Sequence, residues 1–69
     1  MSKGLSMVGK NLKKYREKMK ISQDKLSKIA DTTFHTIAKI ESGATPYPRV
    51  DTLQKIASAL GVSIDDLMK

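Results

Sequence analysis

Basic side chains are the most concentrated chemical feature of this 69-residue sequence, and they gather in its first 20 residues. That stretch contains one acidic residue, Glu17, and seven basic ones: Lys3, Lys10, Lys13, Lys14, Arg16, Lys18 and Lys20. They account for the formal net charge of +6, because the rest of the chain is balanced. Such a density of positive charge favours a polyanionic partner, bound through release of its counterions. A lysine-rich helix that serves only solubility would show the same pattern.

The residue types argue against several other kinds of chemistry. The absence of cysteine excludes disulfides and thiolate zinc sites, and the single His35 cannot form a metal cluster by itself. No nucleophile with a base and no carboxylate pair can be placed in a cleft, which so short a chain could scarcely enclose. We therefore expect no enzyme, no cofactor and no metal.

The location of the protein is expected to be the cytoplasm. No apolar stretch approaches the roughly 18 residues that a membrane-spanning helix requires. The first six residues lack the apolar core of a secretory signal. We expect residues 1–6 to form a flexible arm and residues 7–69 to form one small domain.

Apolar spacing predicts a first helix over residues 8–19. Its inward stripe comprises Val8, Leu12, Tyr15 and Met19. Arg16 lies beside this stripe, where its guanidinium could reach inward to a carboxylate. Ser22 is a good N-cap for a second helix beginning near Gln23. The inward residues of that helix are predicted to be Leu26, Ile29 and Ala30.

A third helix is predicted to follow Thr33, which can cap it, and to end at Gly43. One side of it carries Phe34, Ile37, Ile40 and Glu41. The other side carries His35, Ala38, Lys39 and Ser42. Residues 44–48 hold both prolines of the chain and are expected to form an extended loop.

Two further helices complete the prediction. The fourth ends at Gly61, and its apolar residues are Val50, Leu53, Ile56, Ala57 and Leu60. Ser63 caps a short fifth helix and has the spacing of a capping box with Asp66. This helix carries Ile64, Leu67 and Met68. The pattern predicts an all-α protein of five helices.

Two short helices separated by about three residues, the second with a polar outer face, are typical of a helix-turn-helix. The residues that carry a closer resemblance are Ile21-Ser22-Gln23, Leu26, Ile29-Ala30, Thr33, Ile37, Ile40-Glu41-Ser42-Gly43, Pro48, Leu53, Ile56-Ala57, Ala59-Leu60-Gly61-Val62-Ser63 and Leu67. Over residues 8–68 the sequence resembles the Cro/C1-type (Xre) helix-turn-helix family of bacterial and phage repressors. Asp31 stands where the family commonly has glycine, although aspartate also tolerates a left-handed backbone.

The resemblance implies a fold and a function. The fold is a compact five-helix bundle of the lambda-repressor-like DNA-binding type, with helices 2 and 3 forming the helix-turn-helix. The function is sequence-specific binding of double-stranded DNA by a transcriptional regulator, most simply a repressor that occupies an inverted-repeat operator as a homodimer. The third helix would enter the major groove without any cofactor.

Four residues of that helix are expected to contact bases: Phe34, His35, Thr36 and Lys39. Lys39 can donate to guanine O6 and N7, whereas His35 can donate or accept at a base edge. Phe34 and Thr36 can touch a thymine methyl. The alternatives without a role in DNA binding are that Phe34 belongs to the core and that Lys39 is only a solvated charge.

Contacts with the DNA backbone are expected from a second set: Gln23, Thr33, Ser42, Thr45, Lys10, Lys14 and Arg49. In the family the glutamine that opens the second helix bonds a phosphate and braces the recognition helix, and here that residue is Gln23. The alternative is an exposed glutamine that merely starts the helix. The family also often pairs an arginine of the first helix with the glutamate that ends the third, which here are Arg16 and Glu41. A plain surface ion pair is the alternative, and Tyr47 is expected either to pack on the core or to touch the sugar-phosphate.

The dimer surface is expected at Leu67 and Met68, if so short a fifth helix leaves them exposed. In the alternative, both residues close the core of the monomer. Two other functions use the same domain: an antitoxin or restriction-modification controller, and a protein-interaction module that has lost DNA binding. Gln23, Lys39 and the basic first helix argue against the interaction module.

Overall fold

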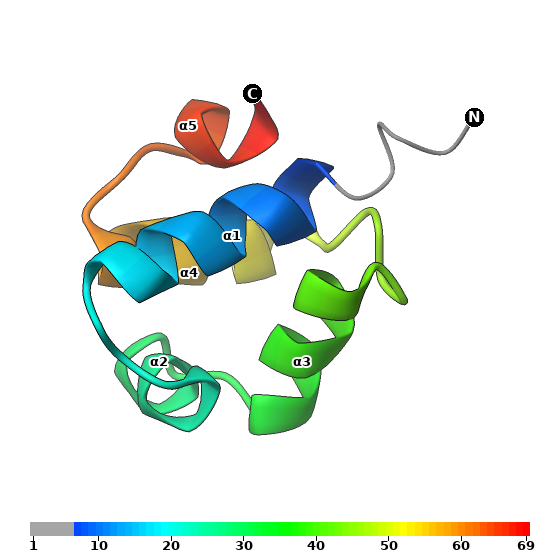
Figure 1. Cartoon of the computed structure of the whole chain (residues 1–69). Helices are drawn as coiled ribbons and strands as arrows, with labels where there is room; N and C mark the ends of the chain where they lie inside the picture. The colour runs from blue at the N-terminus through cyan, green and yellow to red at the C-terminus, as the bar shows by residue number, and fades with distance from the viewer. Residues whose placement is uncertain (1–6) are drawn as a thin grey trace.

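The computed structural model describes residues 7–69, and the expectation of a flexible arm over residues 1–6 falls outside that range. The described chain forms five helices and no strands: α1 (Met7–Lys18), α2 (Gln23–Ile29), α3 (Phe34–Ser42), α4 (Val50–Leu60) and α5 (Ile64–Met68). Figure 1 shows α1 crossing the molecule between α5 on one side and the α2–α3 pair on the other, with α4 behind it. The predicted all-α class is therefore confirmed.

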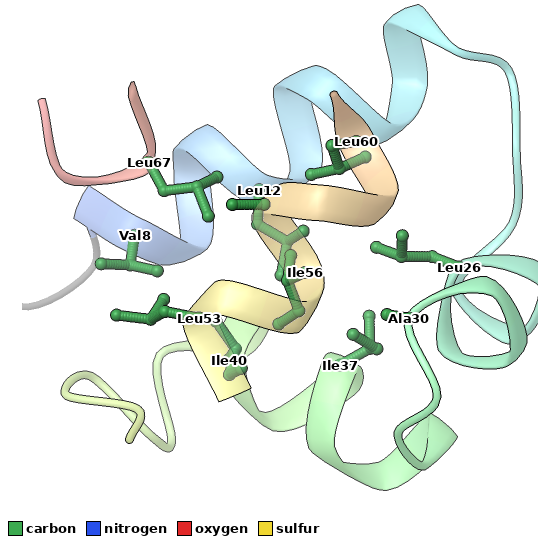
Figure 2. Packing of buried hydrophobic residues seen from close by; sticks show 11 residues of the cluster. Val8, Leu12, Leu26, Ala30, Ile37, Ile40, Leu53, Ile56, Leu60 and Leu67 are labelled. Carbon is green, nitrogen blue, oxygen red and sulfur yellow. The ribbon is translucent and has the colours of Figure 1, made fainter. Parts of the chain in front are cut away.

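One apolar core joins all five helices (Figure 2). Its buried members are Val8, Leu12, Leu26, Ala30, Ile37, Ile40, Leu53, Ile56, Ala57, Leu60 and Leu67. Each was placed on an inward face by apolar spacing or assigned to the fifth helix. Because α3 contributes only Ile37 and Ile40, the opposite side of α3 is left to solvent.

Three of the predicted inward residues are exposed instead: Met19, Ile29 and Val50. Each lies at an end of a helix, where the apolar stripe runs past the neighbouring helices. Met19 follows the last residue of α1, and Ile29 is the last residue of α2. Val50 is the first residue of α4. The prediction of an inward position was wrong for these three residues.

Local hydrogen bonds fix where the helices begin. The hydroxyls of Ser22, Thr33 and Ser63 accept from the amides of Lys25, Thr36 and Asp66 at 3.0, 3.1 and 3.0 Å. The Asp66 carboxylate in turn accepts from the Ser63 amide at 3.1 Å, which completes the predicted capping box and lowers the pKa of Asp66. These bonds confirm the three capping predictions.

Left-handed backbone ends or separates the helices. Gly43 closes α3 at a φ of +88°. Asp31 adopts a φ of +56° in the turn between α2 and α3, which confirms that aspartate can serve where glycine is usual. The short turn directs α3 across α2, so that its outer face is presented to solvent.

Replacing Thr33 by alanine removes the cap of α3 and is expected to destabilise the protein by about 1 kcal/mol. For a domain of this size, the melting temperature should fall by roughly 4–8 °C. Thermal unfolding followed by circular dichroism measures the change, and Thr33→Ser keeps the hydroxyl and should melt close to the parent protein. An alanine variant that melts with the serine variant would show that the cap contributes nothing.

None of the helices in residues 7–69 is both long and apolar enough to cross a membrane.

Candidate nucleic-acid interface

The outer face of α3 carries most of the residues predicted to contact bases. His35 and Lys39 are exposed and, together with Phe34, Ala38 and Ser42, line an open hollow on the surface of this one helix. Phe34 is 47% exposed, so the alternative in which it belongs to the core is wrong. The structure therefore presents an amine, an imidazole and an aromatic ring on one helix face of about two turns.

Thr36, the fourth of these residues, lies apart from the hollow. Its side chain is half-buried, and its hydroxyl is 2.9 Å from the Thr33 hydroxyl at the start of α3. Both threonines thus serve the first turn of the helix. The structure places Thr36 beside the helix cap rather than among the outward residues.

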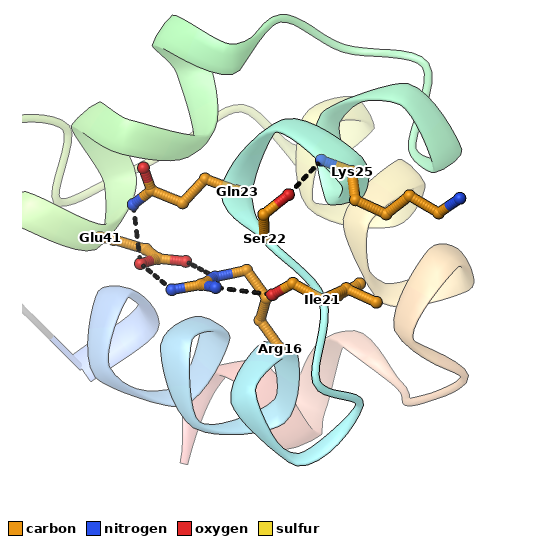
Figure 3. A network of polar contacts seen from close by, with 6 residues as sticks. All are labelled: Arg16, Ile21, Ser22, Gln23, Lys25 and Glu41. Atoms are coloured by element: carbon orange, nitrogen blue, oxygen red, sulfur yellow. Dashed lines mark hydrogen bonds and ion pairs between the residues drawn. The ribbon is translucent and has the colours of Figure 1, made fainter.

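A buried ion pair holds α1 to α3. Arg16 Nε donates to Glu41 Oε2 at 2.7 Å and Arg16 Nη2 donates to Oε1 at 3.1 Å (Figure 3). Only 12% of the Arg16 side chain and 5% of the Glu41 side chain are exposed, so this is no surface pair. Hydrogen bonding to Glu41 raises the pKa of Arg16, and its guanidinium stays charged. Arg16 Nη1 also donates to the Ile21 carbonyl at 2.7 Å, which ties the same group to the chain entering α2.

Gln23 joins the same network and braces α3, as the family resemblance implied, although its partner Glu41 was not predicted. Its Nε2 donates to Glu41 Oε1 at 2.9 Å, so α2 is connected to α1 and α3 through one carboxylate (Figure 3). A carboxamide nitrogen carries two hydrogens, and only one is needed for this bond. The second remains for an acceptor such as a phosphate oxygen. No local pattern relates residues so far apart in the sequence.

Gly9 is a residue that sequence reasoning missed. It is buried in α1 where that helix crosses α3, and a Cβ atom built there would collide with the carbonyl oxygen of Ile40. The same atom would lie 3.2 and 3.3 Å from the backbone oxygen and Cα of Glu41. The two helices therefore meet backbone to backbone. An isolated glycine seven residues before Arg16, and thus on the same helix face, was the available signal.

Lys10 and Lys14, both predicted to contact the DNA backbone, lie outside the hollow on α3. They are exposed and line a separate hollow on α1 with Lys13, Glu17 and Lys18. The face of α1 that meets α3 is the one carrying Gly9 and Arg16. At about 100° per residue, Lys14 lies roughly 140–160° around the helix from those two residues, and Lys10 roughly 100–120°. Lys14 therefore points away from α3, and Lys10 points to the side.

The loop after α3 contains the remaining residues predicted to contact the backbone. The Thr45 amide donates to the Lys39 carbonyl at 3.1 Å, and the Ser42 hydroxyl donates to the same oxygen at 3.1 Å. Arg49 is exposed, and its Nε lies 3.4 Å from Asp51 Oδ1. Tyr47 is 75% exposed, which excludes the alternative in which it packs on the core.

The two residues expected at a dimer surface have different environments. Leu67 is fully buried, because α5 lies against α1 and Asn11 Nδ2 donates to the Leu67 carbonyl at 2.8 Å. The expectation that Leu67 is exposed was wrong, and it closes the core of the monomer. Met68 is 51% exposed and remains accessible.

Comparison with known proteins agrees with this architecture. The helix-turn-helix family model matches residues 12–67, and the chain belongs to this family. The resemblance to its Cro/C1-type members is thereby confirmed.

One relative is the protein named uncharacterized HTH-type transcriptional regulator RghRB of Bacillus subtilis (strain 168). It is 31% identical over 64 residues, which cover 93% of this chain and 46% of the relative. The chain thus spans about half the length of that protein. No solved structure matches the chain.

Proposed function

We propose that this protein is a transcriptional regulator that binds double-stranded DNA sequence-specifically, with α3 in the major groove. The observation that carries the proposal is the division of α3 into two faces. Its inner face is anchored by Ile37, Ile40 and the buried Glu41, while its outer face exposes His35 and Lys39. A helix held so firmly can present its outer side chains to base edges in a defined register.

The comparisons support the same function. The family is that of the helix-turn-helix, and the Bacillus relative is named as a transcriptional regulator. Both also support the prediction that the chain is not an enzyme. On this proposal the protein needs no cofactor, because binding is carried by side chains and backbone amides alone.

Lys39 and His35 are the proposed readers of base edges, and Phe34 the proposed contact with a thymine methyl. Thr36 can reach a base only by exchanging its bond to Thr33, so its contribution is the smallest of the four. The N-terminus of α3, capped by Thr33, faces a phosphate through its free amides and its helix dipole.

The remaining phosphate contacts flank α3 on both sides. Gln23 uses the second hydrogen of its Nε2, while the first holds it to Glu41. Ser42, Thr45 and Arg49 contact the DNA backbone on the far side of the groove. These phosphate contacts fix the position of α3 on the duplex, and the base contacts determine which DNA sequence is preferred.

We further propose that the protein acts as a homodimer on an inverted repeat and represses by covering a promoter. Two copies related by a two-fold axis would place their α3 helices in successive major grooves about 34 Å apart. Met68, exposed at the end of α5, is the proposed contact between copies. Analytical ultracentrifugation with and without a duplex carrying two half-sites tests the dimer, which a complex of one protein per duplex would contradict.

Replacing Lys39 by alanine is expected to weaken binding to the preferred sequence by roughly 1–3 kcal/mol and to relax the preference at one or two base pairs. Dissociation constants for the preferred duplex and its single-base variants measure both effects. Lys28→Ala is the matched control, because Lys28 is an exposed lysine that pairs with Asp24 on α2. An equal loss on every sequence would show that Lys39 contacts phosphate and reads no base.

A further inference from the structure

The positive charge of the protein is concentrated away from its proposed recognition helix. Lys39 is the only lysine or arginine of α3. By contrast, α1 carries Lys10, Lys14 and Lys18, which we call the lysine row. Residues spaced by four lie one above another on a helix, so their side chains emerge about 6 Å apart along a straight line. All three are exposed and line one hollow with Lys13 and Glu17.

Most of the lysine row and the outer face of α3 point in opposite directions. On α1, Lys14 and Lys18 lie roughly 140–180° around the helix from Gly9 and Arg16, which meet α3, and Lys10 lies roughly 100–120° from them. On α3, Lys39 lies about 160° around the helix from Glu41, which meets α1. The outer face of α3 thus faces away from α1, and Lys14 and Lys18 face away from α3. A straight duplex held in the groove by α3 therefore does not reach Lys14 and Lys18.

Cation–π contacts hold part of this row in place. The ammonium groups of Lys14 and Lys18 lie 5.6 and 5.9 Å from the centre of the Tyr15 ring. Tyr15 is itself packed against the core, so it offers a fixed platform to two otherwise flexible side chains. Ordering the two ammonium groups in advance reduces the entropy lost when they meet an anion.

The composition of this surface favours nucleic acid over protein as its occupant. Protein interfaces have an apolar centre that excludes water. Within residues 7–69, the only large exposed apolar side chain on this face of α1 is Met7, at its N-terminal end. A row of evenly spaced cations without an apolar centre suits a phosphate backbone, which is bound by charge alone.

We propose that the lysine row binds the backbone of a second DNA duplex, so that one protein molecule bridges two DNA segments. The inference rests on the proposed function, which supplies the first duplex at α3. Binding at the row does not depend on sequence and is strongly weakened by salt. Three phosphate contacts correspond to a change of about 2.7 in the slope of log affinity against log salt concentration.

A two-duplex capture experiment tests this bridge. A short duplex is fixed to beads, the full chain is bound to it at low salt, and a second fluorescent duplex is added after washing. The variant K10Q/K14Q/K18Q removes the row, whereas K28Q/K55Q/K69Q removes three other exposed lysines and the same net charge. We expect the first variant to stay on the beads but to capture the second duplex about tenfold less well than the parent protein. The control variant should capture it as the parent does.

Two results would overturn the proposal. In the first result, K10Q/K14Q/K18Q captures the second duplex as efficiently as the parent protein. Bridging would then come from two copies of the protein that each bind one duplex through α3. In the second result, the parent protein fails to capture a second duplex but binds polyglutamate, and K10Q/K14Q/K18Q does not bind polyglutamate. That result would assign the lysine row to an acidic protein partner. Retention on the first duplex is read separately and reports on α3, so loss of the proposed function is distinguished from loss of the bridge.

Discussion

Replacing Glu41 by alanine is expected to lower the free energy of unfolding by about 3 kcal/mol, near the lower end of the range for breaking a buried ion pair. Glu41 accepts three hydrogen bonds, two from Arg16 and one from Gln23, and its side chain is 5% exposed. Without it, a guanidinium that is 12% exposed keeps only its bond to the Ile21 carbonyl. A 69-residue protein has a total stability of roughly 3–10 kcal/mol, so the loss would be a large part of it.

Urea unfolding followed by circular dichroism measures the effect of Glu41→Ala. The matched control is Glu17→Ala, which removes an exposed glutamate from α1 and should change stability by no more than about 0.5 kcal/mol. Glu41→Gln keeps one acceptor oxygen and is expected to fall between the two. If Glu41→Ala unfolds at the same urea concentration as Glu17→Ala, the ion pair does not hold α1 to α3.

Replacing Gly9 by valine is expected to destabilise the protein by at least 1–3 kcal/mol. The added Cβ would meet the carbonyl oxygen of Ile40 and the backbone of Glu41, which cannot turn aside as a flexible side chain would. Relief requires α1 and α3 to separate, which stretches the bonds between Arg16 and Glu41. We therefore expect DNA binding to weaken at temperatures where the variant is still folded.

Chemical unfolding and fluorescence anisotropy with a labelled duplex measure the two effects of Gly9→Val. Lys13→Val introduces the same side chain at an exposed position of the same helix and corrects for the low helix propensity of valine. Gly9→Ala should also destabilise, because the collision arises from Cβ itself and outweighs the gain of up to about 1 kcal/mol for removing a helical glycine. If Gly9→Val is as stable as Lys13→Val, α1 and α3 are not in close backbone contact at Gly9.

Much of the fold could be predicted because its signals are local. Ser22, Thr33 and Ser63 cap helices through amides three residues away, and Gly43 and Gly61 end helices by their own backbone conformation. The exposure of Val50 and the burial of Leu67 were mispredicted, because they depend on which helix lies opposite. That relation is set by distant parts of the chain.

The candidate site was predicted to a smaller extent. The residues on the outer face of α3 followed from a family resemblance and from helical spacing, and the structure brings Phe34, His35 and Lys39 around one hollow. The bond between Gln23 and Glu41 joins residues 18 positions apart and has no sequence pattern. The direction of the lysine row was also hidden, because it depends on which face of α1 packs against α3.

The central claim, that α3 reads a DNA sequence, is tested most directly by selecting the purified protein's preferred sites from random duplexes near physiological salt, with excess non-specific DNA present. We predict enrichment of an inverted repeat whose half-sites lie about 10–10.5 base pairs apart, centre to centre. The same selection with His35→Ala/Lys39→Ala should lose or change the enriched bases. Weak, salt-sensitive binding without any enriched sequence would contradict the account and leave α3 without a role in reading DNA.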